Sequence, residues 1–314
     1  MVRSSNAGVV DRKLEGLASP ADRTWGVTLA IVGTFLFALK SIFIKLAFAA
    51  GANATLVLAI RMTLALPFYV GVLWYLRRRE DRKPLQREHV IRATTLGFLG
   101  YYLASYLDLA GLEQISAQLE RLTLFTYPAM VAVLAWLFLG EQINRKIVLA
   151  IALSYFGVLL MYGQERAFTS VGDTSLGVML VIGSALSYSF YILFAKPVMK
   201  HIGSQQFTSL AMIGSTFFVG VHFAATQPLT SLVEAKPIVY VYGLILAFVC
   251  TVIPSFMINE AIMRIGATRT TVIGSVGPVL TMMLAIFVLS EPSSLQHFLG
   301  MAVAIYGVSL VARK

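Results

Sequence analysis

The stretch Tyr127–Glu141 reads YPAMVAVLAWLFLGE, and Gly277–Glu291 reads GPVLTMMLAIFVLSE. The two stretches lie 150 positions apart, and in both a proline at the second position is followed by an apolar run that ends in glutamate. The correspondence extends without a gap from 117–163 to 267–313. A duplication on this scale indicates that the chain contains two copies of one half-domain.

The beginning of the chain repeats at almost the same spacing, 151 positions. Gly26 aligns with Gly177, and Lys45 aligns with Lys196. A unit of this length is far longer than the period of a solenoid repeat. We therefore expect a tail at 1–24, a first repeat at 25–163 and a second repeat at 175–314.

The composition places both repeats in lipid, because 58% of the residues are hydrophobic and 13% are charged. A soluble domain of this size has too little interior to bury so much apolar surface. Windows of about 20 residues, the length that crosses a bilayer, predict an all-α integral membrane protein with ten spans. The predicted spans are 26–48, 54–76, 91–112, 115–138, 147–163, 175–197, 206–226, 238–260, 268–289 and 295–312.

The net charge of +10 follows the predicted topology. Basic residues gather in the N-terminal tail, at the C-terminus and in alternate loops, as in Arg77–Arg79, whereas the other loops carry only Arg166 and Lys236. Cytoplasmic loops retain Lys and Arg, so both termini are expected in the cytoplasm. The basic excess thus argues against nucleic-acid binding. The single cysteine, Cys250, excludes an intrachain disulfide.

Five spans in each half make the second copy enter the membrane from the opposite side to the first. Two halves related in this way can rock against each other and expose a shared site to each compartment in turn. We expect proline to interrupt the fourth and ninth spans, because it removes a backbone hydrogen bond. Pro128, Pro278, Gly274 and Gly277 are therefore the predicted hinge residues beside a cavity at mid-membrane.

These residues resemble the EamA-type branch of the drug/metabolite transporter superfamily over nearly the whole chain. The pattern is Pro128, Leu137–Glu141 and Gly157, echoed by Pro278, Leu289–Glu291 and Gly307, together with Lys45 and Arg61. The resemblance implies a carrier of the bacterial inner membrane, many of which export amino acids or other small metabolites. Tyr127 and Gly277 stand where the family often has an acidic residue before the proline.

Several charged residues fall inside the predicted spans, where each costs about 2.5–3.5 kcal/mol on insertion scales. Lys45 and Arg61 are expected to extend to the outer surface. Asp108 and Arg121 belong to neighbouring spans joined by a short loop, so Asp108 could reach Arg121. The sequence leaves two roles open for Asp108, Glu120 and Arg121, namely a static ion pair or a cluster that binds substrate or protons.

Helical spacing places further polar and aromatic side chains on the same faces as these charges, which would suit a small amphipathic solute. Glu260 has a structural alternative beside Arg264 at the cytoplasmic surface. The candidate substrate-binding or coupling residues are Lys40, Asp108, Glu120, Arg121, Tyr127, Tyr188, Tyr191, Asn259 and Glu260.

Small residues also recur, with Ala150 and Ser154 matching Gly300 and Ala304. This spacing lets helix backbones approach closely, either within one chain or in a homodimer. A second structural prediction concerns Glu141 and Glu291, which each precede a span and are expected to cap its first turn.

The sequence contains no Walker-type phosphate loop, no HExxH and no GxSxG. Its four histidines lack ligand spacing, so neither an enzyme, a metal site nor a cofactor is expected. The predicted function is export of a small metabolite across the cytoplasmic membrane by a secondary transporter in contact with lipid. A channel or a substrate-sensing membrane receptor remains the alternative.

Overall fold

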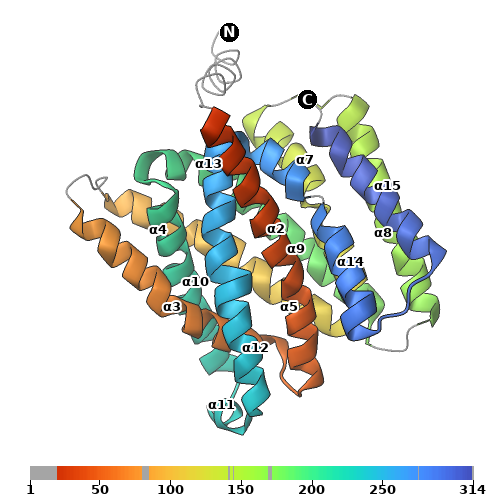
Figure 1. Cartoon of the computed structure of the whole chain (residues 1–314), viewed down its shortest axis with the longest axis horizontal. Coiled ribbons are helices and arrows are strands. Elements are labelled where there is room, and N and C mark those ends of the chain that lie inside the picture. Colours follow the sequence, from red (N-terminus) through yellow and green to blue (C-terminus); the bar gives the residue numbers. More distant parts are fainter. Residues whose placement is uncertain are drawn as a thin grey trace.

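The computed structural model describes residues 20–79, 85–140, 142, 143, 145–168, 172–274 and 276–312, and every regular element in these ranges is a helix (Figure 1). The α-helices of the first part are α2 Pro20–Ala49, α3 Ala54–Arg78, α4 Arg87–Gly97, α5 Ala104–Gln114, α6 Ala117–Leu124, α7 Tyr127–Leu139 and α8 Arg145–Phe168. Those of the second part are α9 Thr174–Ile202, α10 Ser204–Thr226, α11 Thr230–Glu234, α12 Pro237–Ala247, α13 Ile253–Gly274, α14 Val276–Leu289 and α15 Leu295–Ala312. Two π-helical segments, η1 Phe98–Leu103 and η2 Phe248–Val252, lie within longer helices.

Seven helical segments among the described residues are long and apolar enough to cross a membrane. They are Arg23–Ala49, Ala54–Arg78, Ala117–Leu139, Ile147–Arg166, Thr174–Ile202, Ser204–Thr226 and Pro237–Gly266. Two shorter apolar helices follow at Val276–Leu289 and Leu295–Gly307. The prediction of a multi-pass, all-helical membrane protein is thereby confirmed.

Helix ends agree with the sequence prediction where the helix is regular. For α3 and α10 the predicted ends differ from the observed ends by no more than two residues. In contrast, α2 begins at Pro20, so residues 20–24 of the predicted tail are helical. The remainder of that tail, residues 1–19, lies outside the described residues.

The predicted span 91–112 is one helical path made of α4, η1 and α5. In a π-helical turn the carbonyls accept from the N–H five residues later, as Leu99 O does from Ala104 N. Serines of α9 donate further hydrogen bonds here, since Ser187 Oγ lies 2.8 Å from Leu99 O and Ser184 Oγ lies 2.7 Å from Ala104 O. These hydrogen bonds therefore tie η1 and α5 to α9.

The predicted interruption near Pro128 is present, but it precedes the proline. The helix breaks at Phe125 and Thr126, and Pro128 lies in the first turn of α7, where a missing N–H costs little. The carbonyl of Tyr127 accepts a hydrogen bond from Ser189 Oγ at 3.1 Å. Proline therefore starts a new helix at this break, instead of bending a continuous one.

The second copy is interrupted between its predicted spans. Within α13, Gly266 adopts a φ of 83° and separates the end of the predicted eighth span from the start of the ninth. The described part of α13 reaches Gly274, and that of α14 runs from Val276 and contains Pro278. Within the described residues, the predicted fourth span is the one of the two hinge-containing spans that is divided into two helices, at Phe125 and Thr126.

The small residues predicted to pack closely do so within one chain. α8 lies along α15, and a Cβ added at Gly157 would lie 2.4 Å from Gly300 O and 2.7 Å from Ala304 Cβ. A Cβ at Gly307 would lie 2.8 Å from Ala150 O. The small-residue surface is therefore used between α8 and α15, and the homodimer stays a prediction.

Glu291 caps a different helix from the one expected. Its carboxylate accepts hydrogen bonds from Ala117 N at 2.8 Å and Gln118 N at 3.3 Å, at the start of α6. The predicted cap of α15 is therefore wrong for Glu291, although the attraction between a carboxylate and the positive end of a helix applies equally to α6. Glu141 lies outside the described residues.

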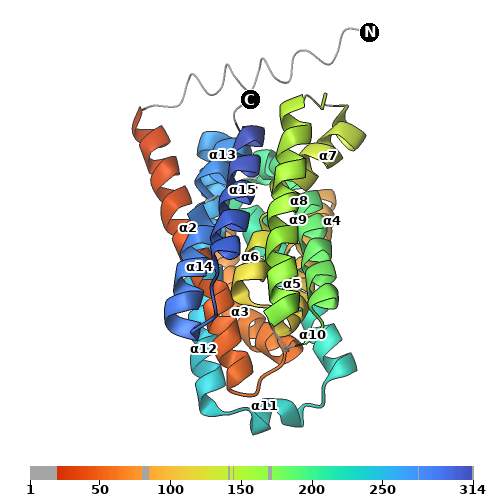
Figure 2. The same ribbon diagram turned by 90° about the vertical axis from the view of Figure 1, so that its right-hand side faces the viewer.

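The two ends of the helical bundle are defined by its first and last helices. α2 begins and α15 ends at the same end of the molecule, whereas α11 lies at the opposite end (Figures 1 and 2). Between them, α2 packs against α13 and α14, and α9 packs against α5 and α7. This arrangement brings the broken helices to the middle of the bundle.

Candidate functional site

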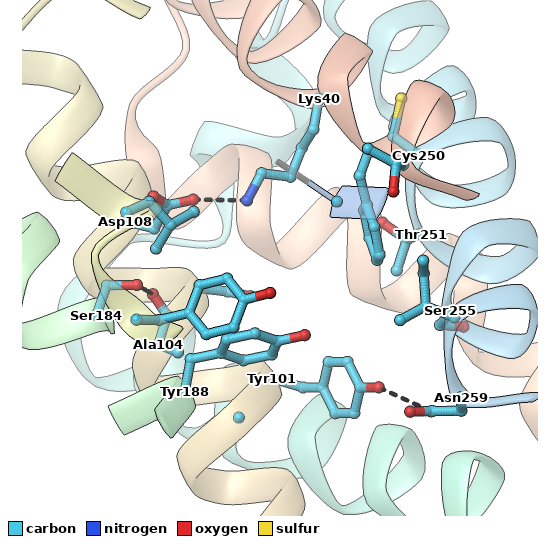
Figure 3. A pocket seen from close by; sticks show the side chains of 18 of the residues that line it. Lys40, Tyr101, Ala104, Asp108, Ser184, Tyr188, Cys250, Thr251, Ser255 and Asn259 are labelled. Carbon is cyan, nitrogen blue, oxygen red and sulfur yellow. Dashed lines mark hydrogen bonds and ion pairs between the residues drawn. The ribbon is translucent and has the colours of Figure 1, made fainter. Parts of the chain in front are cut away.

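A cavity of about 160 Å³ lies between the helices (Figure 3), beside the helix break after α6. Its walls come from both sequence repeats: α2, α3, η1, α5, α6 and α7 in the first, and α9, α10, η2 and α13 in the second. The helix break after α6 contributes Phe125 and Tyr127, and α13 contributes Gly274. Because a helix ends at this break, side chains and backbone together can line the space.

Lys40 and Asp108 form an ion pair in the wall of the cavity. Lys40 Nζ on α2 lies 2.6 Å from Asp108 Oδ2 on α5, with the two side chains 12% and 2% exposed. Asp108 was expected to reach Arg121, so the structure corrects its partner. A buried pair of this kind is costly to separate, because removal of one partner leaves an uncompensated charge.

Glu120 lies next to this pair but does not line the cavity. It is fully buried, and its Oε2 accepts a hydrogen bond of 2.7 Å from Ser41 Oγ. Among the described residues, no donor reaches Glu120 Oε1 or Asp108 Oδ1. Each of these carboxyl groups therefore has an oxygen that is able to accept another hydrogen bond.

Arg61 is the functional candidate that the sequence analysis missed. It was expected to reach the outer surface, but its side chain lines the cavity and is 3% exposed. Arg61 is the eighth residue of α3, which at 1.5 Å per residue places it about 10 Å from the helix start. This depth could have identified Arg61 from the sequence, because the charge lies too far from the helix end for the side chain to reach water.

Aromatic rings form another part of the cavity lining. The Tyr127 and Tyr188 rings meet edge to face with centroids 5.3 Å apart, and both line the cavity with Phe37. Tyr191 stacks behind Tyr188 at 5.6 Å and does not line the cavity. The predicted tyrosines thus come together, with Tyr191 in a supporting position.

A hydrogen-bonded group joins the aromatic wall to α10 and α13. Asn259 Nδ2 donates to Thr208 Oγ1 at 2.7 Å and to Tyr101 OH at 3.2 Å, and Tyr101 OH lies 2.9 Å from Tyr191 OH (Figure 3). Asn259 and Tyr101 line the cavity. Their polar groups already have partners within the protein, so they order this wall.

Glu260 does not join the site. Its carboxylate accepts hydrogen bonds from Arg264 Nε at 2.9 Å and from Ser204 Oγ at 2.7 Å. The structural alternative, a pairing with Arg264, is the one observed. Glu260 follows Asn259 in the helix, and one residue of rotation directs it away from the cavity.

Of the four predicted hinge residues, one lines the cavity and three do not. Gly274 lines the cavity. At Gly277 an added Cβ would lie 3.3 Å from Thr34 Cγ2, a tight contact, and 3.5 Å from Arg121 Nη2, an ordinary one, so this glycine makes room for Thr34. Pro128 and Pro278 are buried and do not line the cavity.

The comparisons with known proteins agree with this architecture. The sequence matches the EamA-like transporter family at residues 24–163 and again at 175–313, so the chain belongs to this family. It is accordingly a multi-pass membrane transporter and not an enzyme.

Relatives with this organisation occur in bacteria and plants. The chain is 29% identical to the uncharacterized transporter YcbK of Bacillus subtilis (strain 168), over 88% of each chain. It is 23% identical to the WAT1-related protein At1g25270 of Arabidopsis thaliana, over 91% of this chain and 88% of that one. A solved crystal structure aligns with a TM-score of 0.65 at 12% identity, over 91% of this chain and 95% of that chain, which shows a shared fold.

Proposed function

We propose that this protein is a secondary carrier that exports a small, amino-acid-like metabolite across the cytoplasmic membrane by alternating access. The observation that carries the proposal is the central cavity, which both sequence repeats line and which lies beside the interruption between α6 and α7. Discontinuous helices at the interface of two repeats are typical of substrate sites in secondary transporters.

Repeated backbone features support an inverted pair of five-span halves, ten spans in all. The π-helical segments begin at Phe98 and Phe248, and the turns after α7 and α14 place Gly140 and Ser290 at positive φ. In both cases the residue numbers differ by 150, the spacing of the sequence repeat. An odd number of spans in each half would orient the halves in opposite senses, as rocking around a shared site requires.

The sidedness is part of the same proposal. Basic residues in alternate loops favour cytoplasmic termini. The first described helix begins and the last one ends at the same end of the bundle, which supports a common side for both (Figure 2). Reporter fusions to the two termini should report the cytoplasm for both, and opposite sides would overturn the arrangement.

Counterflow in proteoliposomes tests the carrier mechanism. Purified protein is first screened for thermal stabilisation by amino acids and small metabolites, and a stabilising compound is then loaded inside vesicles. A carrier should accelerate uptake of the labelled compound when the unlabelled compound is inside. Flux that is indifferent to internal compound, with steady conductance, would indicate a channel. Binding without flux would indicate a receptor.

A further inference from the structure

The cavity contains a buried guanidinium group that forms no ion pair with any residue that the structure describes. Arg61 is 3% exposed and lines the cavity, and its Nε has no hydrogen-bond partner among the described residues. None of the ion pairs within 4.0 Å in the described ranges includes Arg61. A buried charge in this position is unfavourable unless a partner arrives to compensate it.

Asp108 is the carboxylate that lines the cavity, and it is not free to act as the counter-ion of Arg61. Asp108 is already bonded to Lys40, and the neighbouring Glu120 is held by Ser41 outside the lining. Arg121 also lines the cavity, and no ion pair in the described ranges includes it either. The positive charges at the cavity exceed the negative ones by one, even with both carboxylates counted as ionised. The cations are Lys40, Arg61 and Arg121, and the carboxylates are Asp108 and Glu120.

We infer that the cavity binds a small organic anion, a monocarboxylate with a compact apolar body, and that Arg61 and Arg121 are its binding residues. This inference rests on the proposed carrier of small metabolites, and it replaces the amino-acid-like substrate with a monocarboxylate that has no amine. One carboxylate would balance the excess charge. Guanidinium groups pair with carboxylates through two parallel hydrogen bonds, which gives the planar carboxylate an orientation as well as an attraction.

The size of the cavity and its aromatic lining support a compact apolar body. A dry cavity of about 150 Å³ in another protein is large enough to bind benzene, and the cavity here measures about 160 Å³. Phe37, Tyr127 and Tyr188 face it from α2, α7 and α9. A solute of one ring with one carboxylate therefore matches both the volume and the two kinds of wall.

Both arginines line the same cavity as the Lys40–Asp108 pair. The anion would therefore bind beside this pair, where it competes with Asp108 for the same cations. This arrangement disfavours a substrate amine, because the cations at the cavity already exceed the carboxylates by one charge and a further cation would increase that excess. The site is thus expected to prefer an anion over the corresponding neutral or cationic compound.

Benzoate, benzamide and benzylamine test the inference, since they share one ring and differ in charge. Thermal stabilisation of the purified full chain should be strong with benzoate and absent with the other two. Equal stabilisation by benzamide or benzylamine would overturn the inference, as would tighter binding of inorganic phosphate than of benzoate. This comparison needs no variant, so a misfolded protein cannot obscure it.

Variants then assign the residues. Arg61→Gln should weaken benzoate binding at least about tenfold, as expected for loss of a charge-assisted hydrogen bond, and Arg121→Gln should weaken it to a smaller extent. The control is Arg92→Gln, because Arg92 is exposed and pairs with Glu88 outside the cavity. Unchanged binding in both cavity variants would overturn the assignment.

The benzoate test of the anion site and the counterflow test of the carrier mechanism can fail independently of each other. Benzoate binding without counterflow would uphold the anion site and contradict the carrier. Counterflow of a cationic or neutral compound, with no effect of benzoate, would uphold the carrier and overturn the anion site.

Discussion

A substitution at Glu120 can separate a role in transport coupling from a structural role. Gln has the same shape and can still accept the hydrogen bond from Ser41, but it cannot carry the charge or exchange a proton. We expect Glu120→Gln to abolish transport while leaving the amount of protein in the membrane unchanged. Quantified membrane expression and counterflow test this, with the exposed Glu88→Gln as control. Normal transport by Glu120→Gln would assign Glu120 to structure alone.

For the Lys40–Asp108 pair, a double substitution is needed to separate a role in transport from a structural role. Asp108→Asn should lower the free energy of unfolding by about 3–5 kcal/mol, because Lys40 is left buried without its counter-ion. Lys40→Met combined with Asp108→Leu removes both charges and should recover most of that loss.

Thermal denaturation of the three proteins measures the stability difference, and counterflow measures the function. If the pair takes part in transport, the double variant accumulates normally and does not transport. If the double variant transports like the wild type, the pair is a static link between α2 and α5.

At the scale of the element, Gly274 and Gly277 distinguish a hinge from a packing site. An added Cβ at Gly277 would meet Thr34 and Arg121 at 3.3 and 3.5 Å, whereas at Gly274 it would meet only Thr34 Oγ1, at 3.9 Å. We expect Gly277→Ala to slow transport a few-fold because Thr34, which lines the cavity, must shift. Gly274→Ala should transport normally and gain about 0.5–1 kcal/mol of stability from reduced chain entropy. Equal slowing in both variants would indicate that flexibility of the helices is what matters, as the sequence predicted.

Element positions were largely predictable, because hydropathy reports the length of chain that lies in lipid. The start of α3 and the end of α10 agree with their predicted residues. The breaks were not predictable in detail. Pro128 marks the region, but whether it bends a helix or begins one depends on donors such as Ser189, which belong to another helix.

The site was predictable only as a set of residues. Lys40, Asp108 and Tyr188 do line one cavity, because their positions on each helix follow from the helical period. The partner of Asp108 depends on the rotation of α2 against α5, and no pattern within a single helix reports that rotation. Arg61 is a different case, because its depth within α3 is visible in the sequence and already argues against the surface.

At the scale of the whole molecule, Cys250 is a native probe of alternating access. It is the chain's one cysteine, and it lines the cavity. If the two halves rock around the cavity, a charged, membrane-impermeant thiol reagent should reach Cys250 from the outer face in right-side-out vesicles and from the cytoplasmic face in inside-out vesicles. Modification should be slow, since the thiol is buried between openings, and Cys250→Ser should remain unlabelled.

A permanently open pore would also allow labelling of Cys250 from both faces, but at a rate that does not respond to bound solute. A carrier held in one conformation by a ligand should instead lose labelling from one face and keep it from the other. Labelling confined to a single face under all conditions would contradict the rocking of the two halves.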